Sequence, residues 1–305
     1  MSSSFRLLLP LAVAVPFSCP PAAAQDDEGV VARAGATKVQ TSGYFTRVVQ
    51  RDIMLGMQVN ARYVARADAA NLFGLGTPWE ALAQAGALAR WDPTQEPLTY
   101  YHRTGPVGAI FHHLRTRKGG ADARSPVGVI GLNCGTVAAF ARRGQAVTFY
   151  ESSPDLKLLV ADTDRHFTYL HDAGRRGATV DVKFGPARRL LAADSDRRFA
   201  LLLVEMIDTG FDPGDRLTLE AVRLYLDRTT PDGLVGLHVS NREFHLEPVV
   251  GRIARELRLA ARVWHDDRAG SPGKSTSSWV VLGRAEADLG PWPGRWSSRS
   301  KGSAH

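Results

Sequence analysis

Residues 127–151 contain the pattern that most constrains what this chain can fold into. An apolar run at 127–130 is followed by a glycine turn at 131–136, a short helical segment, and a second apolar run at 147–150 that ends in Glu151. Turn glycines let the backbone pass close to a ligand, the helix that follows offers free N–H groups, and an acidic residue about 20 positions on can accept ribose hydroxyls. The pattern predicts an α/β sheet with a nucleotide site.

The glycine turn departs from the dinucleotide fingerprint. That fingerprint reads G-x-G-x-x-G, whereas this turn has Gly131, Asn133 and Gly135, which is nearer the looser loop of S-adenosylmethionine-type enzymes. Asparagine tolerates a positive φ better than most residues, although its side chain narrows the approach to a ligand. We therefore take these three residues and Glu151 as candidate cofactor-binding residues. The alternative is an ordinary turn with Glu151 as a surface carboxylate.

The first residues of the chain favour export. Residues 1–24 combine Arg6, an apolar run at 7–17 and small residues at 22–24, which is the pattern of a secretory signal peptide, and the run is too short for a stable anchor. We expect a periplasmic or secreted protein with no transmembrane helix in its mature form. A membrane-anchored form and a lipoprotein attached at Cys19 are the alternatives.

Composition limits the other classes of function. The 305 residues are 44% hydrophobic and 23% charged, as in a globular protein with one large domain or a large and a small one. The formal charge of +7 comes from scattered arginine pairs, which we interpret as solvated faces, so we expect no nucleic-acid partner. The nine histidines show no paired ligand spacing, and we expect no metal. A homodimer stays open.

The chain divides by composition into several parts. After the signal peptide, 25–38 is small and polar and is interpreted as a linker, and 39–98 as a small N-terminal domain that is partly β. Residues 99–290 follow as a Rossmann-like domain, and 291–305 as a polar tail. The candidate elements before residue 127 are strands at 44–51, 53–59 and 62–64 and helices at 68–88 and 105–117.

Beyond Glu151, strands and helices alternate. Several strands are continuous apolar runs, as expected when helices cover both faces of a mostly parallel sheet. The strand candidates are 179–184, 199–206, 234–240, 261–265 and 277–283, with helices at 217–227 and 247–257. Ligands bind beyond the carboxyl ends of such strands. The residues expected there are Gly131, Glu151, Gly185, Glu205 and Ser240, and Gly185 joins the candidate cofactor-binding residues.

Several ordered blocks carry a resemblance to a known family. They are residues 96–108 (EPLTYYHRTGPVG), the loop at Gly131, 164–170 (DRHFTYL), 238–242 (HVSNR) with 246–248 (LEP), and 278–282 (SWVVL). Together they resemble the spermidine synthase-like (polyamine aminopropyltransferase) domain of the fused, membrane-linked bacterial type. The resemblance covers about residues 95–290, the soluble domain only, and is weak in the N-terminal part.

The resemblance implies a Rossmann-like fold of the S-adenosylmethionine-methyltransferase type with a small N-terminal β-containing domain. It implies that decarboxylated S-adenosylmethionine, as co-substrate, gives an aminopropyl group to a diamine such as putrescine. The family places two aspartates three apart after the fourth strand, and Glu205 with Asp208 keeps that spacing. The implied catalytic residues are Asp208, Glu205 and Tyr101, and the implied substrate-binding residues are His102, Asp212 and Asn241. Asp208 would bind and deprotonate the amine.

Departures from the family pattern leave the activity open. The family's aspartate that contacts the adenine is replaced by Pro186, which has no N–H to offer, and Ser152–Pro154 replaces an Ile-Asp-Pro type of block. An exported protein would also meet little of a donor made in the cytosol. A non-catalytic descendant that binds a polyamine or a nucleoside is the main alternative to the enzyme, and a methyltransferase is the third.

Overall fold

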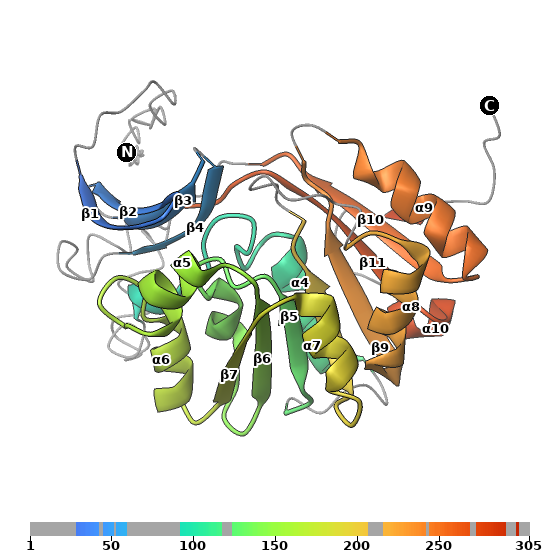
Figure 1. The fold of residues 1–305 in the computed structure, drawn as a ribbon. Helices are drawn as coiled ribbons and strands as arrows, with labels where there is room; N and C mark the ends of the chain where they lie inside the picture. Colours follow the sequence, from blue (N-terminus) through green and yellow to red (C-terminus); the bar gives the residue numbers. More distant parts are fainter. Residues whose placement is uncertain are drawn as a thin grey trace, which may run out of the picture.

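The computed structural model describes residues 29–42, 45–51, 53–59, 92–117, 124–206, 216–241, 244–268, 273–290 and 297–298. These residues form two sheets (Figure 1), a four-stranded one built from the first part of the chain and an eight-stranded one flanked by helices.

The large sheet is mostly parallel. Its strands, in order across the sheet, are β12 (Ser297–Ser298), β10 (Ala260–Asp266), β11 (Ser277–Gly283), β9 (Thr229–His238), β8 (Phe199–Val204), β5 (Val127–Ile130), β6 (Ala146–Glu151) and β7 (Thr179–Phe184). The neighbours from β9 to β7 are all parallel, whereas β11 runs antiparallel to both β9 and β10. This arrangement confirms the predicted Rossmann-like sheet of the methyltransferase type.

The chain reverses its direction of travel across the sheet at β5. From β5 it moves outward to β6 and β7, and then returns to β8 on the other side of β5. In open α/β sheets the crevice for a ligand lies at such a switch point, outside the carboxyl ends of the strands. The residues that follow β5 and β8 are Gly131 and Glu205, so the topology places both at the expected ligand crevice.

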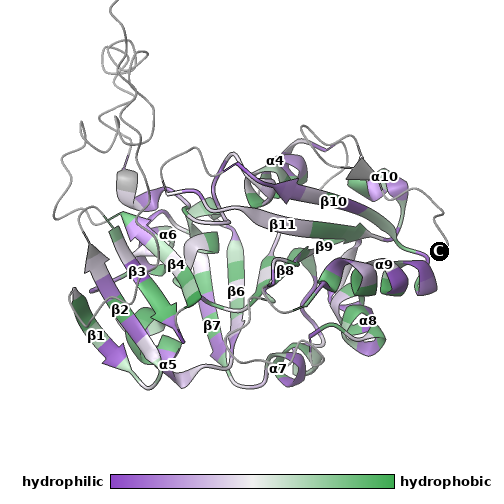
Figure 2. Ribbon diagram, turned by 90° about the horizontal axis from the view of Figure 1, so that it is seen from above, coloured by the Kyte–Doolittle hydropathy of each residue, from purple (hydrophilic) through white to green (hydrophobic). Residues whose placement is uncertain are grey.

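Helices and single helical turns cover both faces of the sheet. They are η1 (Pro93–Gln95), α4 (Pro106–Thr116), η2 (Thr136–Phe140), α5 (Pro154–Leu156), η3 (Lys157–Ala161), α6 (Tyr169–Arg175), α7 (Ala187–Ala193), α8 (Leu219–Asp227), α9 (Leu246–Glu256) and α10 (Glu286–Leu289). In β8, Leu201 and Leu203 belong to one hydrophobic cluster with α4 and α6, while Leu202 and Val204 belong to a second cluster with α7, α8 and α9. Figure 2 shows the hydrophobic centre of the sheet and the mixed colouring of α8 and α9. The continuous apolar run of β8 is therefore explained by burial on both faces.

The small sheet is an antiparallel meander of β1 (Val30–Ala34), β2 (Thr37–Ser42), β3 (Phe45–Gln50) and β4 (Ile53–Val59). The strands expected at 44–51 and 53–59 are confirmed. The linker expected at 25–38 is corrected, because β1 and the start of β2 lie within it. The burial of β1 alternates between half-buried and exposed positions, but its residues VVARA do not alternate between apolar and polar, so the sequence has no strand pattern there.

The small sheet packs directly on the large one. Tyr100 Oη donates to the carbonyls of Met54 (3.0 Å) and Leu55 (2.7 Å), and Tyr169 Oη donates to the carbonyl of Met57 (3.2 Å). Gly56 lies against the Cys134 side chain, where any Cβ would overlap the sulfur atom. Strand β4 therefore covers the glycine turn, and Gly56 is required for that close approach.

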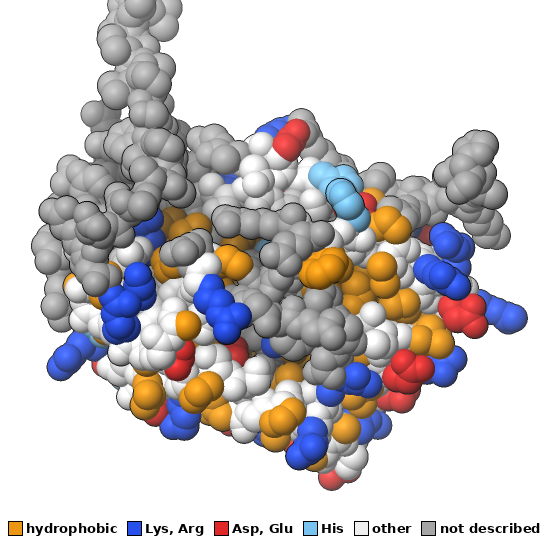
Figure 3. Space-filling view, turned by 45° about the horizontal axis from the view of Figure 1, so that its top comes forward, with side chains coloured by type: hydrophobic (Ala, Val, Ile, Leu, Met, Phe, Trp, Pro, Cys, Tyr) orange, Lys and Arg blue, Asp and Glu red, His pale blue; other side chains and the backbone are white. Residues whose placement is uncertain are grey.

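Some predictions lie outside the described residues. These are the signal peptide at 1–24, the strand at 62–64, the helix at 68–88, and all of the tail at 291–305 except Ser297 and Ser298. Within the ranges that the structure does describe, no helix is both long and apolar enough to cross a membrane. On the face shown in Figure 3, lysine and arginine side chains are scattered among acidic and hydrophobic ones.

Candidate functional site

The glycine turn adopts the backbone conformation that its residues were expected to allow. Gly131, Asn133 and Gly135 all have positive φ angles, of 101°, 52° and 79°. A Cβ at Gly131 would lie 2.8 Å from the Cβ of Glu205, and one at Gly135 would lie 2.9 Å from the side chain of Leu170. Asparagine is one of the few residues with a side chain that tolerates this region. The turn is therefore a left-handed loop packed closely against its neighbours.

Glu151 closes this loop from the end of β6. Its Oε2 accepts the backbone N–H of Leu132 at 2.7 Å, and its Oε1 accepts those of Ser152 and Ser153, each at 2.7 Å. The residue is only 5% exposed, so it is not the surface carboxylate of the alternative reading. A carboxylate offers about four acceptor positions. Three are occupied by the protein, which leaves acceptor capacity for about one ligand hydroxyl.

Gly185 joins the same edge of the sheet. Its N–H donates to the backbone carbonyl of Glu151 at 2.8 Å, and its φ is 141°. Pro186 follows it and precedes α7. All five candidate cofactor-binding residues thus lie at the carboxyl ends of β5, β6 and β7, as predicted from their positions after apolar runs.

Glu205 and His238 form a buried pair beside this loop. Their strands, β8 and β9, are parallel neighbours, and Val204 is in register with Leu237. His238 Nδ1 lies 2.8 Å from Glu205 Oε2, and the two side chains are 0% and 3% exposed. His238 was not assigned a role from the sequence, although it begins one of the blocks that carry the family resemblance and it ends a strand.

Aromatic rings enclose the pair. The ring of Trp279 stacks on that of His238, with centroids 4.6 Å apart and planes at 6°, and the ring of Tyr100 lies on His238 at 4.7 Å. Tyr101 contacts both Tyr100 and Trp279, at 5.1 and 6.2 Å. This enclosure removes the histidine and the carboxylate from solvent.

Tyr101 connects the loop to the pair. Its hydroxyl accepts a hydrogen bond from Asn133 Nδ2 at 2.8 Å. Burial, and next the negative charge of Glu205, raise the pKa of Tyr101 well above its ordinary value. The phenol is therefore neutral and keeps its proton at physiological pH. Three of the predicted site residues, Asn133, Tyr101 and Glu205, thus meet at one place although they come from distant segments.

His102 has a different environment from its neighbour Tyr101. Its Nδ1 accepts the backbone N–H of Thr104 at 3.2 Å and lies 2.9 Å from the Thr104 hydroxyl. Burial, followed by the positive charges of Lys274 and Arg103, lowers the pKa of His102 to about 4. Lys274 and Arg103 are each paired with a carboxylate, of Asp266 and Glu96, so the local charge does not argue for or against a diamine at this position. The surroundings suit a neutral, structural histidine.

This environment predicts a pH dependence of stability. The folded pKa is lower than the ordinary value of 6.5, so the unfolded chain binds more protons, and stability falls as the pH is lowered from 6.5 to about 4. We expect His102 to account for at most about 3 kcal/mol of the free energy of unfolding over that range. His102→Asn retains an acceptor near Nδ1 without titrating. Denaturant unfolding of both proteins at several pH values should show a flatter profile for the variant, and parallel profiles would refute the assignment.

The other predicted residues are less informative. Asn241 donates through Nδ2 to the carbonyl of Met206 at 3.3 Å and accepts the N–H of Phe244 at 2.9 Å. It therefore shapes the turn after β9 and holds the end of the segment that follows β8. Asp208 and Asp212 lie outside the described residues, and their predicted roles stay predictions. Among the described residues, no cluster of His, Cys, Asp or Glu could hold a metal ion.

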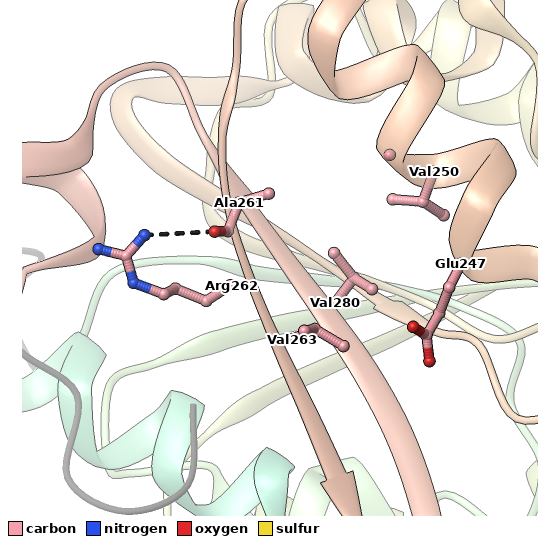
Figure 4. A pocket seen from close by; sticks show the side chains of 7 residues that line it. Glu247, Val250, Ala261, Arg262, Val263 and Val280 are labelled. Atoms are coloured by element: carbon pink, nitrogen blue, oxygen red, sulfur yellow. Dashed lines mark hydrogen bonds between the residues drawn. The ribbon is translucent and has the colours of Figure 1, made fainter. Parts of the chain in front are cut away.

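A small apolar pocket lies elsewhere, between α9 and the strands β10 and β11 (Figure 4). Val250, Val263 and Val280 line it, and Arg262 at its rim donates to the carbonyl of Ala261 at 3.2 Å. Strands β11, β9 and β8 separate β10 from the glycine loop at β5. This pocket is therefore separate from the candidate site.

No family model and no curated protein matches the chain. Among solved structures, the chain is similar to spermidine synthase from Thermotoga maritima, with 11% identity, a TM-score of 0.48, and coverage of 85% of this chain and 74% of that chain. It is also similar to the O-methyltransferase TomG from Streptomyces achromogenes in complex with SAM, with 15% identity, a TM-score of 0.42, and coverage of 67% and 96%. A probable spermidine synthase from Corynebacterium glutamicum has 11% identity, a TM-score of 0.40, and coverage of 81% and 76%. These likenesses concern the fold, and the reaction has to be argued from the site.

Proposed function

We propose that the protein transfers an aminopropyl group from decarboxylated S-adenosylmethionine to a diamine such as putrescine. The observation that carries the proposal is the convergence of Asn133, Tyr101 and Glu205 at the switch point of the sheet, beside a glycine loop closed by Glu151. The residue types fit the two substrates of such a reaction. The nucleoside donor would bind at the glycine loop, and the amine would bind at the carboxylate of Glu205.

The chemistry explains why a carboxylate and aromatic rings serve this reaction. The donor carries a sulfonium cation, and the acceptor is an ammonium ion that has to lose one proton before it attacks. A buried carboxylate attracts the cation and accepts a proton, and aromatic faces stabilise a positive charge. Glu205 supplies the buried carboxylate, and Tyr100 and Tyr101 beside it supply the aromatic rings.

A non-catalytic descendant is the second candidate, and two observations favour it. Glu151 already accepts three backbone hydrogen bonds, and Pro186 stands where the family has an adenine-binding aspartate, which weakens the donor site. The loss of one such hydrogen bond costs about 1 to 3 kcal/mol, or roughly ten- to a hundredfold in affinity. Export, expected from residues 1–24, would also separate the protein from a cytosolic donor.

Calorimetric titration of the full-length protein separates these functions. The ligands are methylthioadenosine, decarboxylated S-adenosylmethionine, S-adenosylmethionine and putrescine, and each titration is followed by a product assay. We expect methylthioadenosine and decarboxylated S-adenosylmethionine to bind. With putrescine added, we expect spermidine to form. Binding of putrescine alone would support the non-catalytic descendant. Binding of S-adenosylmethionine with transfer of a methyl group would establish the methyltransferase instead, and absence of nucleoside binding would exclude both enzymes.

A further inference from the structure

His238 is held in a single orientation. It is the direct antiparallel partner of Trp279 across β9 and β11, and the two rings are stacked. Tyr100 lies on the ring as well, and its own hydroxyl is fixed by the carbonyls of β4. A fully buried imidazole packed in this way cannot turn without displacing its neighbours. Its Nδ1 therefore stays directed at Glu205 Oε2.

The second oxygen of the carboxylate has no partner in hydrogen-bond geometry, although the Tyr101 hydroxyl is close enough to interact with the carboxylate. Among the described residues, Glu205 Oε1, His238 Nε2 and Trp279 Nε1 are buried polar atoms without a hydrogen bond. Buried polar groups are nearly always paired, and an unpaired carboxylate oxygen is especially costly, so such an atom calls for a functional explanation. Arg216 donates to the backbone carbonyl of Glu205 at 2.7 Å. The carboxylate itself lies 2.8 Å from His238 Nδ1 and interacts with the Tyr101 hydroxyl.

The carboxylate of Glu205 borders the candidate donor site. A Cβ at Gly131 would lie 2.8 Å from the Cβ of Glu205, so the carboxylate stem touches the glycine loop. On its other side the charge of Glu205 acts on the Tyr101 hydroxyl, which Asn133 fixes. The carboxylate therefore stands between the loop and the aromatic enclosure.

We infer that His238 is a positioning residue that holds Glu205 through Nδ1–H and Oε2, so that Glu205 Oε1 is presented as the proton acceptor for the attacking group. This inference rests on the proposed function and assigns the base within it. The acceptor nitrogen forms a bond to the carbon next to the sulfonium, the carbon–sulfur bond breaks, and sulfur keeps the electron pair as a neutral thioether. The proton lost by nitrogen passes to Oε1, and no further reactant is needed. His238 touches none of the reacting atoms.

Two substitutions separate positioning from packing. His238→Phe keeps an aromatic ring against Trp279 but removes the donor, whereas His238→Asn keeps a donor near Nδ1 but loses the ring. Positioning predicts that His238→Phe lowers kcat about 100-fold with KM within about threefold of the parent, and that His238→Asn retains more of the activity. Packing alone predicts the reverse order, and that result would overturn the inference. His113→Phe alters a buried histidine on α4 and should leave kcat unchanged.

A spectroscopic measurement tests the pair without turnover. In ¹⁵N-histidine spectra of the full-length protein, the signal that is absent from His238→Phe is assigned to His238. We expect this signal to show a proton on Nδ1. We expect Glu205→Gln to change its chemical shift. If that nitrogen carries no proton, or if the shift is absent, the inference is wrong whether or not the protein transfers an aminopropyl group. If the pair is found but no donor reacts, it is the proposed function that fails.

Discussion

Replacing Glu205 with glutamine is expected to lower kcat about 10³-fold, because an amide cannot accept the proton that the attacking amine loses. Glutamine has nearly the same volume, so the packing under Tyr100 and Tyr101 is retained. Affinity for methylthioadenosine should change by no more than about threefold, since the contacts of the nucleoside are expected at Glu151 and the glycine loop. Single-turnover measurements with a saturating donor report the chemical step directly.

The matched control for Glu205→Gln is Glu256→Gln, which makes the same chemical change at an exposed position of α9. It should leave kcat, affinity and stability as they are in the parent. If Glu205→Gln turned over at the parental rate while folded, the base would have to be another group, and Asp208 would become the first candidate. A fall in donor affinity as large as the fall in kcat would instead place Glu205 at the nucleoside.

Much of the large sheet could be predicted because burial on two faces leaves a mark in the sequence. The runs at 127–130 and 277–283 coincide with the buried strands β5 and β11, and the alternating segment at 179–184 coincides with the half-buried edge strand β7. The positions of the candidate cofactor-binding residues could be predicted because each follows a predicted strand, and their role stays a prediction. The strands of the small sheet at 30–42 were not predicted, because their small and polar residues resemble a linker and β1 has no fully buried residue.

The pair of Glu205 and His238 illustrates what the sequence could not supply. Glu205 was accessible to prediction because it directly follows a buried strand. The proposed role of His238 depends on two contacts. One is its pairing with Trp279, about 40 residues further on, and the other is its contact with Glu205, 33 positions earlier, at the end of the neighbouring parallel strand. Neither relation has a local signal. The wider enclosure depends likewise on the docking of β4 over Tyr100, which joins two sheets that the sequence suggested as separate parts.

The docking of β4 also connects the small sheet to the chemistry. Tyr100 binds the carbonyls of Met54 and Leu55 with its hydroxyl and lies on His238 with its ring. The position of the imidazole therefore depends on the small sheet through Tyr100. This explains physically why a small β sheet precedes the Rossmann-like part of the chain: it covers the glycine loop and fixes one wall of the enclosure.

Replacing Glu151 with glutamine is expected to loosen the same loop from the other side. The amide oxygen can still accept the N–H groups of Ser152 and Ser153, but the amide nitrogen would face the N–H of Leu132, a donor against a donor. A lost hydrogen bond to a charged group, with a buried donor left unsatisfied, costs about 3 kcal/mol. We expect the free energy of unfolding to fall by about that amount, together with a loss of methylthioadenosine affinity of at least about tenfold, because the loop is the proposed donor site.

The two effects of Glu151→Gln can be measured separately, by denaturant unfolding and by calorimetric titration below the unfolding transition. A loss of stability without a loss of affinity would mean that Glu151 only holds the loop and that the remaining acceptor position is not used by a ribose. A loss of affinity at unchanged stability would contradict the three backbone hydrogen bonds themselves. Loss of both, with Glu256→Gln unchanged in both, is the result that the geometry predicts, because one carboxylate then fixes the loop at Leu132 and completes the nucleoside site.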